Sequence, residues 1–208
     1  MYSLYYSPFA CSFAVHAALE KIGQPFDLIK VDIYKSEHLK PEFLSINPQA
    51  QVPVLQQGNA CTTQASAILL LLSEQHPDAQ VMPSINSEER AEALEMLFYL
   101  SNTIHPIFSR LFNPDRFSEA SANEVKSSAL IALKTKLTEL NTRLSKQDYC
   151  ASNTLYAPDY YLFAMLNWLR LYSISINDYP NLKAFIQRMK GHTEIQTALT
   201  KEMQSMAA

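Results

Sequence analysis

The sequence is poor in glycine and modest in charge. It holds three glycines in 208 residues, where an average chain of this length would hold about fifteen. A sheet-rich fold with many tight turns needs more glycine, because tight turns require positive φ angles that glycine adopts readily. Charged residues make up 18% and apolar residues 48% of the chain, a balance typical of globular rather than disordered proteins. We therefore expect a globular, helix-rich protein.

Long apolar runs, basic runs and an export signal are also missing. The longest clear apolar run covers residues 67–72, whereas a membrane-spanning helix needs roughly 18 consecutive apolar residues. Lys and Arg number 17 against 20 Asp and Glu, a formal net charge of −3, and no basic patch of the nucleic-acid-binding kind is present. Residues 1–19 are uncharged, but they lack the positive start and unbroken apolar stretch of a secretory signal. We expect neither membrane nor nucleic acid as a partner.

The cysteines do not form a disulfide or metal pattern. Cys11, Cys61 and Cys150 are odd in number and widely spaced. There is no C-x-x-C pair, and no cysteine stands at a zinc-ligand spacing from a histidine. Free thiols are typical of a reducing compartment. We therefore expect a cytoplasmic protein without a metal site.

The first 76 residues predict alternating strands and helices. The expected strands cover residues 2–6, 26–33, 52–55 and 60–63, and the expected helices cover residues 11–22, 37–46 (weakly) and 64–76. Two strands separated by a helix are expected to be parallel, and the pair joined by the turn at Gln57-Gly58-Asn59 forms a hairpin. This order is that of a thioredoxin-like domain with a mixed four-stranded sheet.

The rest of the chain predicts helices only. Residues 77–87 have mixed polarity and are expected to be a linker, and residues 88–208 a helical bundle domain. The expected helices cover residues 88–112 with a kink at Pro106, and residues 118–145, 158–172, 182–189 and 194–206. The helix at 158–172 is apolar nearly all round, which predicts a central, buried position. The fold class is therefore α/β followed by all-α.

Five segments, in order along nearly the whole chain, resemble glutathione transferases, most closely the bacterial beta class. They are residues 4–12 (LYYSPFACS), 47–55 (NPQAQVPVL), 63–68 (TQASAI), 104–114 (IHPIFSRLFNP) and 159–163 (DYYLF) with Trp168 beyond. The resemblance implies a cysteine-bearing turn, a cis-proline, a segment that holds the γ-glutamyl end of glutathione, a histidine-bearing helix and the start of a buried helix. It also implies glutathione as co-substrate and a homodimer.

Cys11 is the first candidate catalytic residue. It lies at the expected N-terminus of the first helix, where unpaired N–H groups and the helix dipole favour a thiolate. In the functional interpretation it faces bound glutathione and forms a mixed disulfide with it. The alternative is a small buried apolar residue, which is the interpretation preferred for Cys61 and Cys150.

The candidate glutathione-binding residues lie on two neighbouring segments. A cis bond at Val52-Pro53 would turn backbone groups outward to pair with a peptide-like ligand; the alternative is an ordinary edge-strand proline. Gln64 and Ser66, with Ala65 between them, open the apolar helix, whose first N–H groups suit a carboxylate. Simple helix capping is the alternative for both.

His105 is the second candidate catalytic residue. Helical spacing places it on a mixed polar and aromatic stripe with Asn102 and Phe108, as expected for the wall of a cleft that binds an apolar electrophile. There it would manage a proton or hydrogen-bond to glutathione sulfur; a structural histidine is the alternative. The neighbouring face predicts the core stripe of Leu97, Leu100, Ile104, Ile107 and Leu111.

Three further residues carry weaker predictions. Lys35 follows the second strand and is placed to reach the glycyl carboxylate, with a solvated surface lysine as the alternative. Trp168 belongs to a stripe that predicts helical core, from which its ring edge would touch the cleft. Asp159 is expected to be a structural helix cap.

Several residues depart from the beta-class pattern. Phe9 stands where glycine is usual, so a reshaped or partly covered turn before Cys11 is expected. Ala65 and Gln64 replace more polar residues of the glutathione segment, and Phe98 stands where a hydrogen-bonding Asn is common. These changes predict weaker glutathione binding and a narrower, more apolar electrophile site.

The sequence therefore predicts a detoxifying glutathione transferase that conjugates glutathione to small apolar electrophiles. A thiol-disulfide or peroxide-reducing side activity through Cys11 is the close variant. The alternatives are a non-catalytic ligand-binding protein with a decayed glutathione site and a glutathione-dependent cis-trans isomerase, which would be expected to have a serine-rich turn before the first helix.

Overall fold

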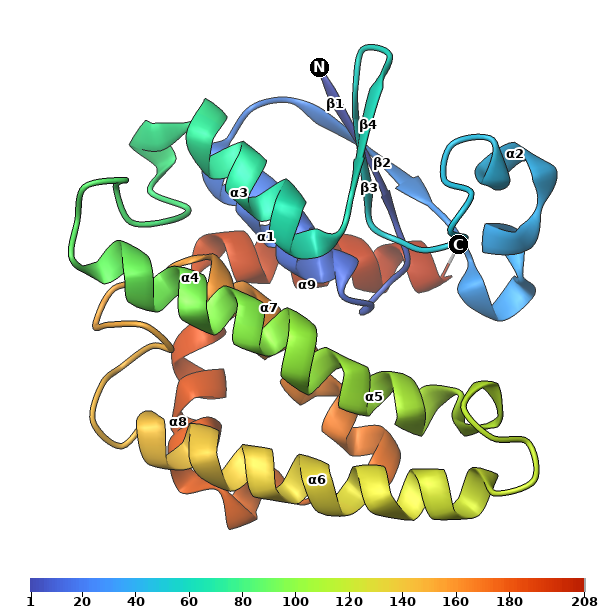
Figure 1. Ribbon diagram of the computed structural model, residues 1–208. Coiled ribbons are helices and arrows are strands. Elements are labelled where there is room, and N and C mark those ends of the chain that lie inside the picture. The colour runs from blue at the N-terminus through green and yellow to red at the C-terminus, as the bar shows by residue number, and fades with distance from the viewer. Residues whose placement is uncertain (208) are drawn as a thin grey trace.

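The structure of the protein, a computed structural model, describes residues 1–207. It consists of a sheet half and a helical half that lie against each other (Figure 1). The sheet half contains β1 (Tyr2–Tyr6), α1 (Ser12–Ile22), β2 (Phe26–Lys30), α2 (Pro41–Leu44), β3 (Val54–Gln57), β4 (Ala60–Thr63) and α3 (Ala65–Gln75). The helical half contains α4 (Glu89–Tyr99), α5 (His105–Phe112), α6 (Ala122–Arg143), α7 (Ala157–Asn167), α8 (Pro180–Met189) and α9 (Thr193–Ala207).

The four strands form one mixed sheet in the order β2-β1-β3-β4. β1 pairs with β2 in parallel, and the pairs β1–β3 and β3–β4 are antiparallel. Leu4 lies opposite Leu28 on one side and Leu55 on the other, and Leu4 and Leu55 are buried in the core. The predicted thioredoxin-like sheet is confirmed.

Helices α1 and α3 begin at the same edge of this sheet. Both β1 and β4 are antiparallel to β3, so they run in one direction and the helices that follow them start at a shared carboxyl edge. Tyr5 near the end of β1 pairs with Val54 at the start of β3, so the Val52-Pro53 segment enters the sheet from that edge too. Ligand sites of sheet proteins commonly form at the carboxyl ends of strands.

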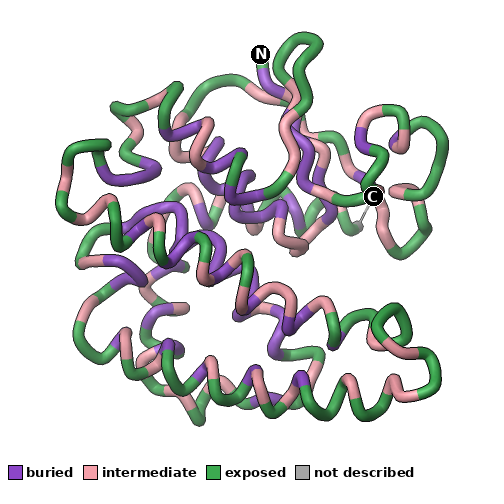
Figure 2. Tube along the Cα trace, in the orientation of Figure 1, coloured by how far each residue is buried: buried purple, intermediate pink, exposed green. Residues whose placement is uncertain are grey.

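Helix α7 forms the centre of the helical half. Its residues from Ala157 to Leu166 are all buried, as Figure 2 shows, which confirms the position predicted from its apolar sequence. It packs against α1, α4 and α8. Helix α9 returns to the sheet half and packs against α1.

The long helix predicted over residues 88–112 is interrupted by a wider turn. A π-helical segment, Leu100–Ile104, separates α4 from α5, and the His105 N–H bonds the Leu100 carbonyl. Pro106 explains the interruption, because it has no N–H for the carbonyl four residues earlier and its ring would clash there. The predicted core stripe of this helix is confirmed, since its five members are at most 7% exposed: Leu97, Leu100, Ile104, Ile107 and Leu111.

Two expectations, one about a helix and one about the burial of a cysteine, are wrong. The helix predicted over residues 158–172 is α-helical only to Asn167 and continues as a 3₁₀ segment, Trp168–Tyr172. Cys61 is exposed rather than buried, because β4 is an edge strand and the hairpin extends beyond the helices that cover the sheet (Figure 1).

Within residues 1–207, no helix combines the length and the apolar character needed to cross a membrane. In the same range, no three His, Cys, Asp or Glu side chains gather closely enough to hold a metal ion.

Candidate functional site

The backbone of the turn between β1 and α1 is held by hydrogen bonds to side chains of the helical half. Phe9 has φ 58°, the left-handed conformation that favours glycine and costs other residues about 1–2 kcal/mol. Its N–H donates to Glu202 Oε2 at 2.6 Å, and its carbonyl accepts from Trp168 Nε1 at 2.7 Å. The Arg170 guanidinium lies 5.7 Å from its ring centroid. Phenylalanine thus takes a glycine-like backbone, which these interactions stabilise.

Cys11 lies at the N-cap of α1, directly after this turn. Its Sγ is 3.4 Å from the carbonyl of Val52 and donates to it, and the Val52-Pro53 peptide bond is cis, as the resemblance implies. Burial raises the pKa of the Cys11 thiol to about 12, although the backbone N–H groups of Cys11 and Ser12 act to lower it. In the ligand-free protein, the cost of desolvating a thiolate at this position outweighs its stabilisation by the helix terminus.

The start of α3 places polar groups at the same sheet edge. Gln64 is the N-cap residue with φ 70°, and its Nε2 lies 3.4 Å from Gln49 Oε1. Ser66 is 7% exposed, and among the described residues its buried Oγ has no hydrogen-bond partner. Ala65 is 5% exposed, so its methyl group is buried. A buried hydroxyl beside free helix N–H groups suits a carboxylate.

His105 opens α5 and faces the start of α7. Its Nδ1 lies 2.7 Å from the Tyr161 hydroxyl, and its ring centroid lies 5.3 Å from the Trp168 ring. Burial lowers the pKa of His105 to about 4. The imidazole is therefore neutral near pH 7 and is a weak base there.

Aromatic side chains surround His105, but not all of them are accessible enough to line a cleft for an electrophile. Phe108 is 1% exposed and packs on Trp168 at 5.0 Å, so its expected place on the cleft wall is wrong. Phe112, one helical turn after Phe108, packs on the same tryptophan. It is 40% exposed and therefore accessible to a ligand. Asn102 is also exposed, and it accepts from the Ser101 hydroxyl at 3.2 Å.

Trp168 joins the helical half to the turn before Cys11. It is 6% exposed, which confirms the predicted core position. Its hydrogen bond to the Phe9 carbonyl spans 159 residues of sequence, and no local pattern predicts such a contact. The turn that positions Cys11 therefore depends on the helical half.

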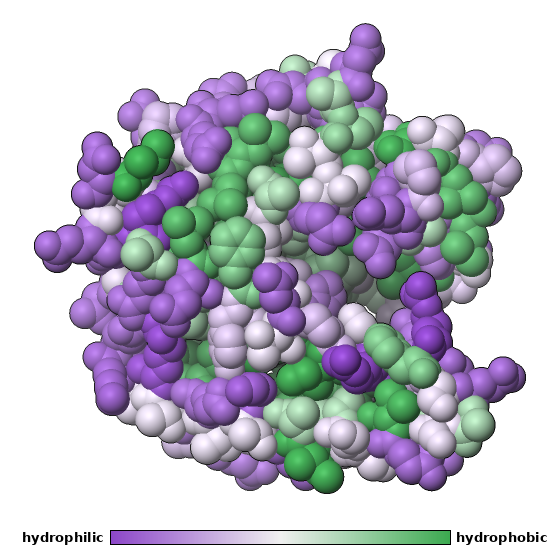
Figure 3. Space-filling view, viewed as in Figure 1, coloured by the Kyte–Doolittle hydropathy of each residue, from purple (hydrophilic) through white to green (hydrophobic). Residues whose placement is uncertain are grey.

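The loop after β2 lies across from the helical half. Lys35 is 75% exposed at its side chain and pairs with Asp32 at 3.4 Å, as the surface alternative predicts. The preceding Tyr34 is 87% exposed; burial, together with this neighbouring tyrosine, raises the pKa of Tyr172 to about 12. Figure 3 shows the surface hollowed between the sheet half and the α5 end of the helical half.

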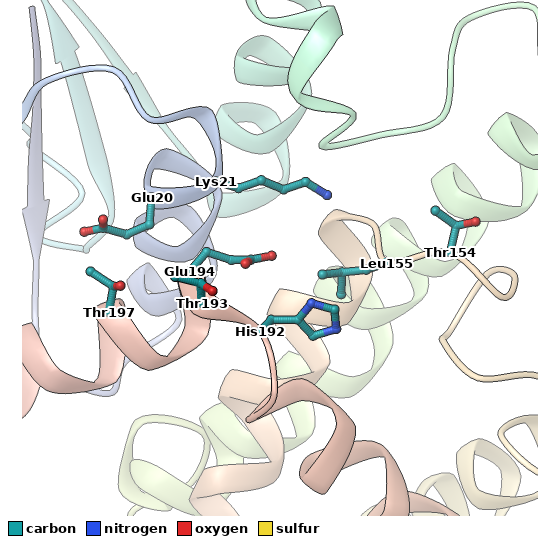
Figure 4. A pocket seen from close by; sticks show the side chains of 8 residues that line it. All are labelled: Glu20, Lys21, Thr154, Leu155, His192, Thr193, Glu194 and Thr197. Carbon is teal, nitrogen blue, oxygen red and sulfur yellow. The ribbon is translucent and has the colours of Figure 1, made fainter.

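Two cavities lie away from these residues. One, of about 450 Å³, lies between α1, the segment before α7 and the start of α9 (Figure 4). It is lined by Glu20, Lys21, Thr154, Leu155, His192, Thr193, Glu194 and Thr197. The other, of about 360 Å³, lies beside β2 and α2. Neither is lined by a predicted site residue.

Two side chains next to the site were not predicted to have a role there. Tyr161 lies in the segment 159–163, for which the sequence predicts only the start of a buried helix, and Glu202 carries no prediction. Each bonds a site residue from far along the chain: Tyr161 lies 56 residues from His105, and Glu202 lies 193 residues from Phe9. Asp159 is a structural cap as predicted, since its carboxylate accepts from the N–H groups of Cys150 and Tyr156.

Comparison with known proteins gives matches over most of the chain. Residues 1–74 match the family model "Glutathione S-transferase, N-terminal domain", and residues 99–192 match "Glutathione S-transferase, C-terminal domain". Glutathione S-transferase GstA of Escherichia coli O157:H7 is 31% identical over 201 residues, covering 96% of this chain and 98% of GstA.

Two solved structures extend the comparison. A sphingomonad glutathione S-transferase complexed with glutathione is 32% identical, with a TM-score of 0.85 over 96% of this chain and 98% of that one. A bacterial beta-class enzyme of Sphingomonas chungbukensis is 34% identical, with the same TM-score of 0.85 and the same coverage of 96% and 98%.

Proposed function

The chain belongs to the glutathione S-transferase family, and we propose that it binds glutathione at the shared edge of β1 and β4 and conjugates it to small apolar electrophiles. The proposed glutathione-binding domain covers residues 1–76, the linker residues 77–87, and the helical domain with the electrophile site residues 88–208. We expect it to act in the cytoplasm in detoxification.

The unpartnered hydroxyl of Ser66 carries this proposal. A buried hydroxyl without a partner in the described part of the chain lies in the first turn of α3, where helix N–H groups favour an anion. The γ-glutamyl end of glutathione carries a carboxylate of that kind. Its ammonium group would lie near Gln64, a neutral amide that attracts a cation less than a carboxylate would.

The remaining parts of glutathione then follow the sheet edge. Its peptide backbone would pair beside Val52 and Pro53, and its sulfur would lie between the N-terminus of α1 and His105. The glycyl carboxylate is placed towards Lys35, whose exposed ammonium group is screened by water and by Asp32. The sequence-predicted weakening of glutathione binding follows from Gln64 and from the exposure of Lys35.

Conjugation requires the thiolate of glutathione, because the thiolate rather than the thiol is the nucleophile. In the proposed reaction the thiol proton leaves to solvent and the sulfur attacks an electrophilic carbon. A C–S bond forms, and the leaving group departs with its electron pair. The N-terminus of α1 and the neutral His105 would lower the thiol pKa by stabilising the anion.

The electrophile site would be aromatic and narrow. Phe112 is in aromatic contact with both Trp168 and Tyr172, and it is the most exposed of the three. Phe9, in the sheet half, lies next to these rings because its carbonyl accepts a hydrogen bond from Trp168. Such walls favour flat, apolar substrates.

A thiol-disulfide activity through Cys11 would be secondary. In that reaction the Cys11 thiolate attacks a glutathione-containing disulfide, forms a Cys11–glutathione mixed disulfide and releases the other sulfur as a thiolate. Because burial raises the pKa of Cys11 to about 12, little thiolate is present near pH 7 in the ligand-free protein.

The proposal is tested by calorimetric titration of the reduced protein with glutathione. We expect saturable binding with a Kd below about 1 mM, roughly −4 kcal/mol. Ser66→Ala should weaken binding by more than about tenfold, since one hydrogen bond to a charged group is worth about 1.5–3 kcal/mol. Ser73→Ala is the matched control, because Ser73 is also 7% exposed on α3 but bonds the Leu70 carbonyl.

Two outcomes would redirect the proposal. No heat at several millimolar glutathione, at two temperatures, would favour the non-catalytic ligand-binding protein. Binding without turnover of activated aryl chlorides would move the electrophile to another class. The expected homodimer is checked separately by sedimentation, which should give twice the 23.6 kDa mass of the chain.

A further inference from the structure

Tyr161 and His105 form a hydrogen-bonded pair beside the proposed sulfur position. Tyr161 lies in α7 and is 3% exposed, and its hydroxyl is 2.7 Å from Nδ1 of His105. The two rings are nearly perpendicular, at 85°, with centroids 5.8 Å apart. Burial, with a smaller electrostatic contribution from Cys11, raises the pKa of Tyr161.

The surroundings decide which partner donates. A buried tyrosine hydroxyl must give its proton to an acceptor, and an unsatisfied one costs about 1–3 kcal/mol. Within residues 1–207, Nδ1 of His105 is the hydrogen-bond partner of the Tyr161 hydroxyl. The nearby Cys11 thiol is itself directed to the Val52 carbonyl. The hydroxyl therefore donates and Nδ1 accepts.

The protonation of the imidazole follows. Burial lowers the pKa of His105 to about 4, so the ring is neutral at physiological pH and carries a single N–H. With Nδ1 accepting, that proton is on Nε2. No hydrogen bond occupies Nε2 in the described part of the chain, and the Trp168 ring, tilted by 43° at 5.3 Å, restricts rotation of the imidazole.

We propose that Tyr161 is a positioning residue that holds His105 in the Nε2–H tautomer, so that the imidazole donates a hydrogen bond to the glutathione sulfur instead of accepting its proton. This inference rests on the proposed function and assigns the direction of one interaction within it. The thiol proton then leaves to solvent, and the N–H of His105 stabilises the sulfur anion that remains. A histidine base would require the opposite arrangement, with a free lone pair at Nε2.

The tautomer is tested without glutathione, by ¹⁵N NMR of histidine-labelled protein near pH 7. A His105→Gln variant identifies the His105 signals among those of the five histidines. We expect a protonated Nε2 and an unprotonated, hydrogen-bonded Nδ1 in the natural protein. A protonated Nδ1 in that spectrum overturns the proposal.

The role of Tyr161 is tested with Tyr161→Phe, which removes only the hydroxyl. We expect a mixture of both tautomers, a loss of about tenfold in kcat for conjugation, and a glutathione KM within about twofold of the original. Ultraviolet absorbance of the bound thiolate should titrate at higher pH. Tyr160→Phe is the control, because Tyr160 is buried in the same helix but donates to Glu194 at 2.9 Å.

The outcomes separate this inference from the proposed function. An Nε2–H tautomer that persists in Tyr161→Phe, with unchanged kcat, overturns the positioning role. The expected tautomers in the absence of any glutathione binding support the positioning of His105 and reject the proposed function. A fall in kcat for Tyr160→Phe equal to that of Tyr161→Phe attributes the effect to packing and also overturns the role.

Discussion

Cys11 and Cys61 show how differently one chain can surround the same side chain. Cys11 ends a turn packed under the helical half, whereas Cys61 is exposed on the edge strand β4. A helix terminus favours a nearby anion by about 0.3–1 kcal/mol. Raising the pKa of a thiol from 9.0 to about 12 corresponds to about 4 kcal/mol. The free-energy cost of desolvating the thiolate therefore exceeds its stabilisation by the helix dipole, and Cys11 is a neutral thiol before glutathione binds.

Alkylation rates should reveal this difference. In the ligand-free protein at pH 7.5, we expect iodoacetamide to modify Cys61 at least tenfold faster than Cys11. The Cys11 rate should keep rising by about tenfold per pH unit beyond pH 10, because the thiolate fraction rises with pH up to the pKa. Peptide mass spectrometry measures both rates in one sample. A Cys11 rate that levels off below pH 8 would contradict the raised pKa.

A Cys11→Ser substitution should separate the two proposed reactions. We expect thiol-disulfide exchange to be lost, since it needs the Cys11 sulfur, and conjugation to fall by no more than about tenfold. Both activities are assayed on the same preparation, with Cys61→Ser as the control for loss of a thiol. Equal loss of both activities would show that conjugation also requires the Cys11 sulfur.

At the scale of elements, α9 stabilises the turn before α1. Glu202 of α9 is fully buried; Oε1 lies 2.9 Å from His16 Nδ1, and Oε2 accepts from the Phe9 N–H. His16 also lies 3.2 Å from Glu20. Burial acts to lower the pKa of His16, but the hydrogen bonds and charges of Glu20 and Glu202 outweigh it and raise that pKa overall.

Glu202→Gln should lower the free energy of unfolding by about 2–3 kcal/mol, because it weakens hydrogen bonds to a buried charged pair. A histidine whose pKa is raised on folding stabilises the fold. This contribution is fully present at pH values below the unfolded-state pKa near 6.5, and it is lost as the pH rises through the folded-state pKa. The loss should therefore be larger at pH 6 than at pH 8.5, by about 1 kcal/mol.

Denaturant unfolding at the two pH values measures this effect. Glu95→Gln, at an exposed position on α4, controls for the change in net charge. A penalty for Glu202→Gln that is the same at both pH values would show that His16 is not charged in the folded protein.

At the scale of the whole molecule, the two halves depend on each other. Helix α1 packs against both α7 and α9, and Trp168 reaches from the helical half to the Phe9 carbonyl. The buried residues of α1, α3 and α7 belong to one apolar core that crosses between the halves. Unfolding either half would expose apolar surface on the other, so neither is expected to unfold alone.

Unfolding should therefore be one cooperative transition. Trp168 is the single tryptophan and lies at the junction of the halves, so its fluorescence reports the junction, while far-UV circular dichroism reports all the helices. We expect the two denaturant curves to coincide, as two-state unfolding requires. A fluorescence transition at clearly lower denaturant would show that the halves separate before they unfold.

Much of this architecture was predictable from the sequence. The succession of strands and helices along residues 1–76, the hairpin and the core stripe through Leu97 and Leu111 follow from spacing within short segments, which reports which face of an element is apolar. Pro106 was predicted to disturb its helix, but not to produce a π-helical segment. Phe108 was misplaced because helical spacing defines a face and does not say what packs over it.

The sequence by itself determined the order of the elements, the buried centre at α7 and the family to which the chain belongs, because these depend on local periodicity and on short motifs. Only the tertiary structure decided the protonation of Cys11 and His105 and the contacts of Phe9 with Glu202 and Trp168. Those properties depend on how far water is excluded and on partners 56 to 193 residues away along the chain. Neither quantity exists until the halves have packed together.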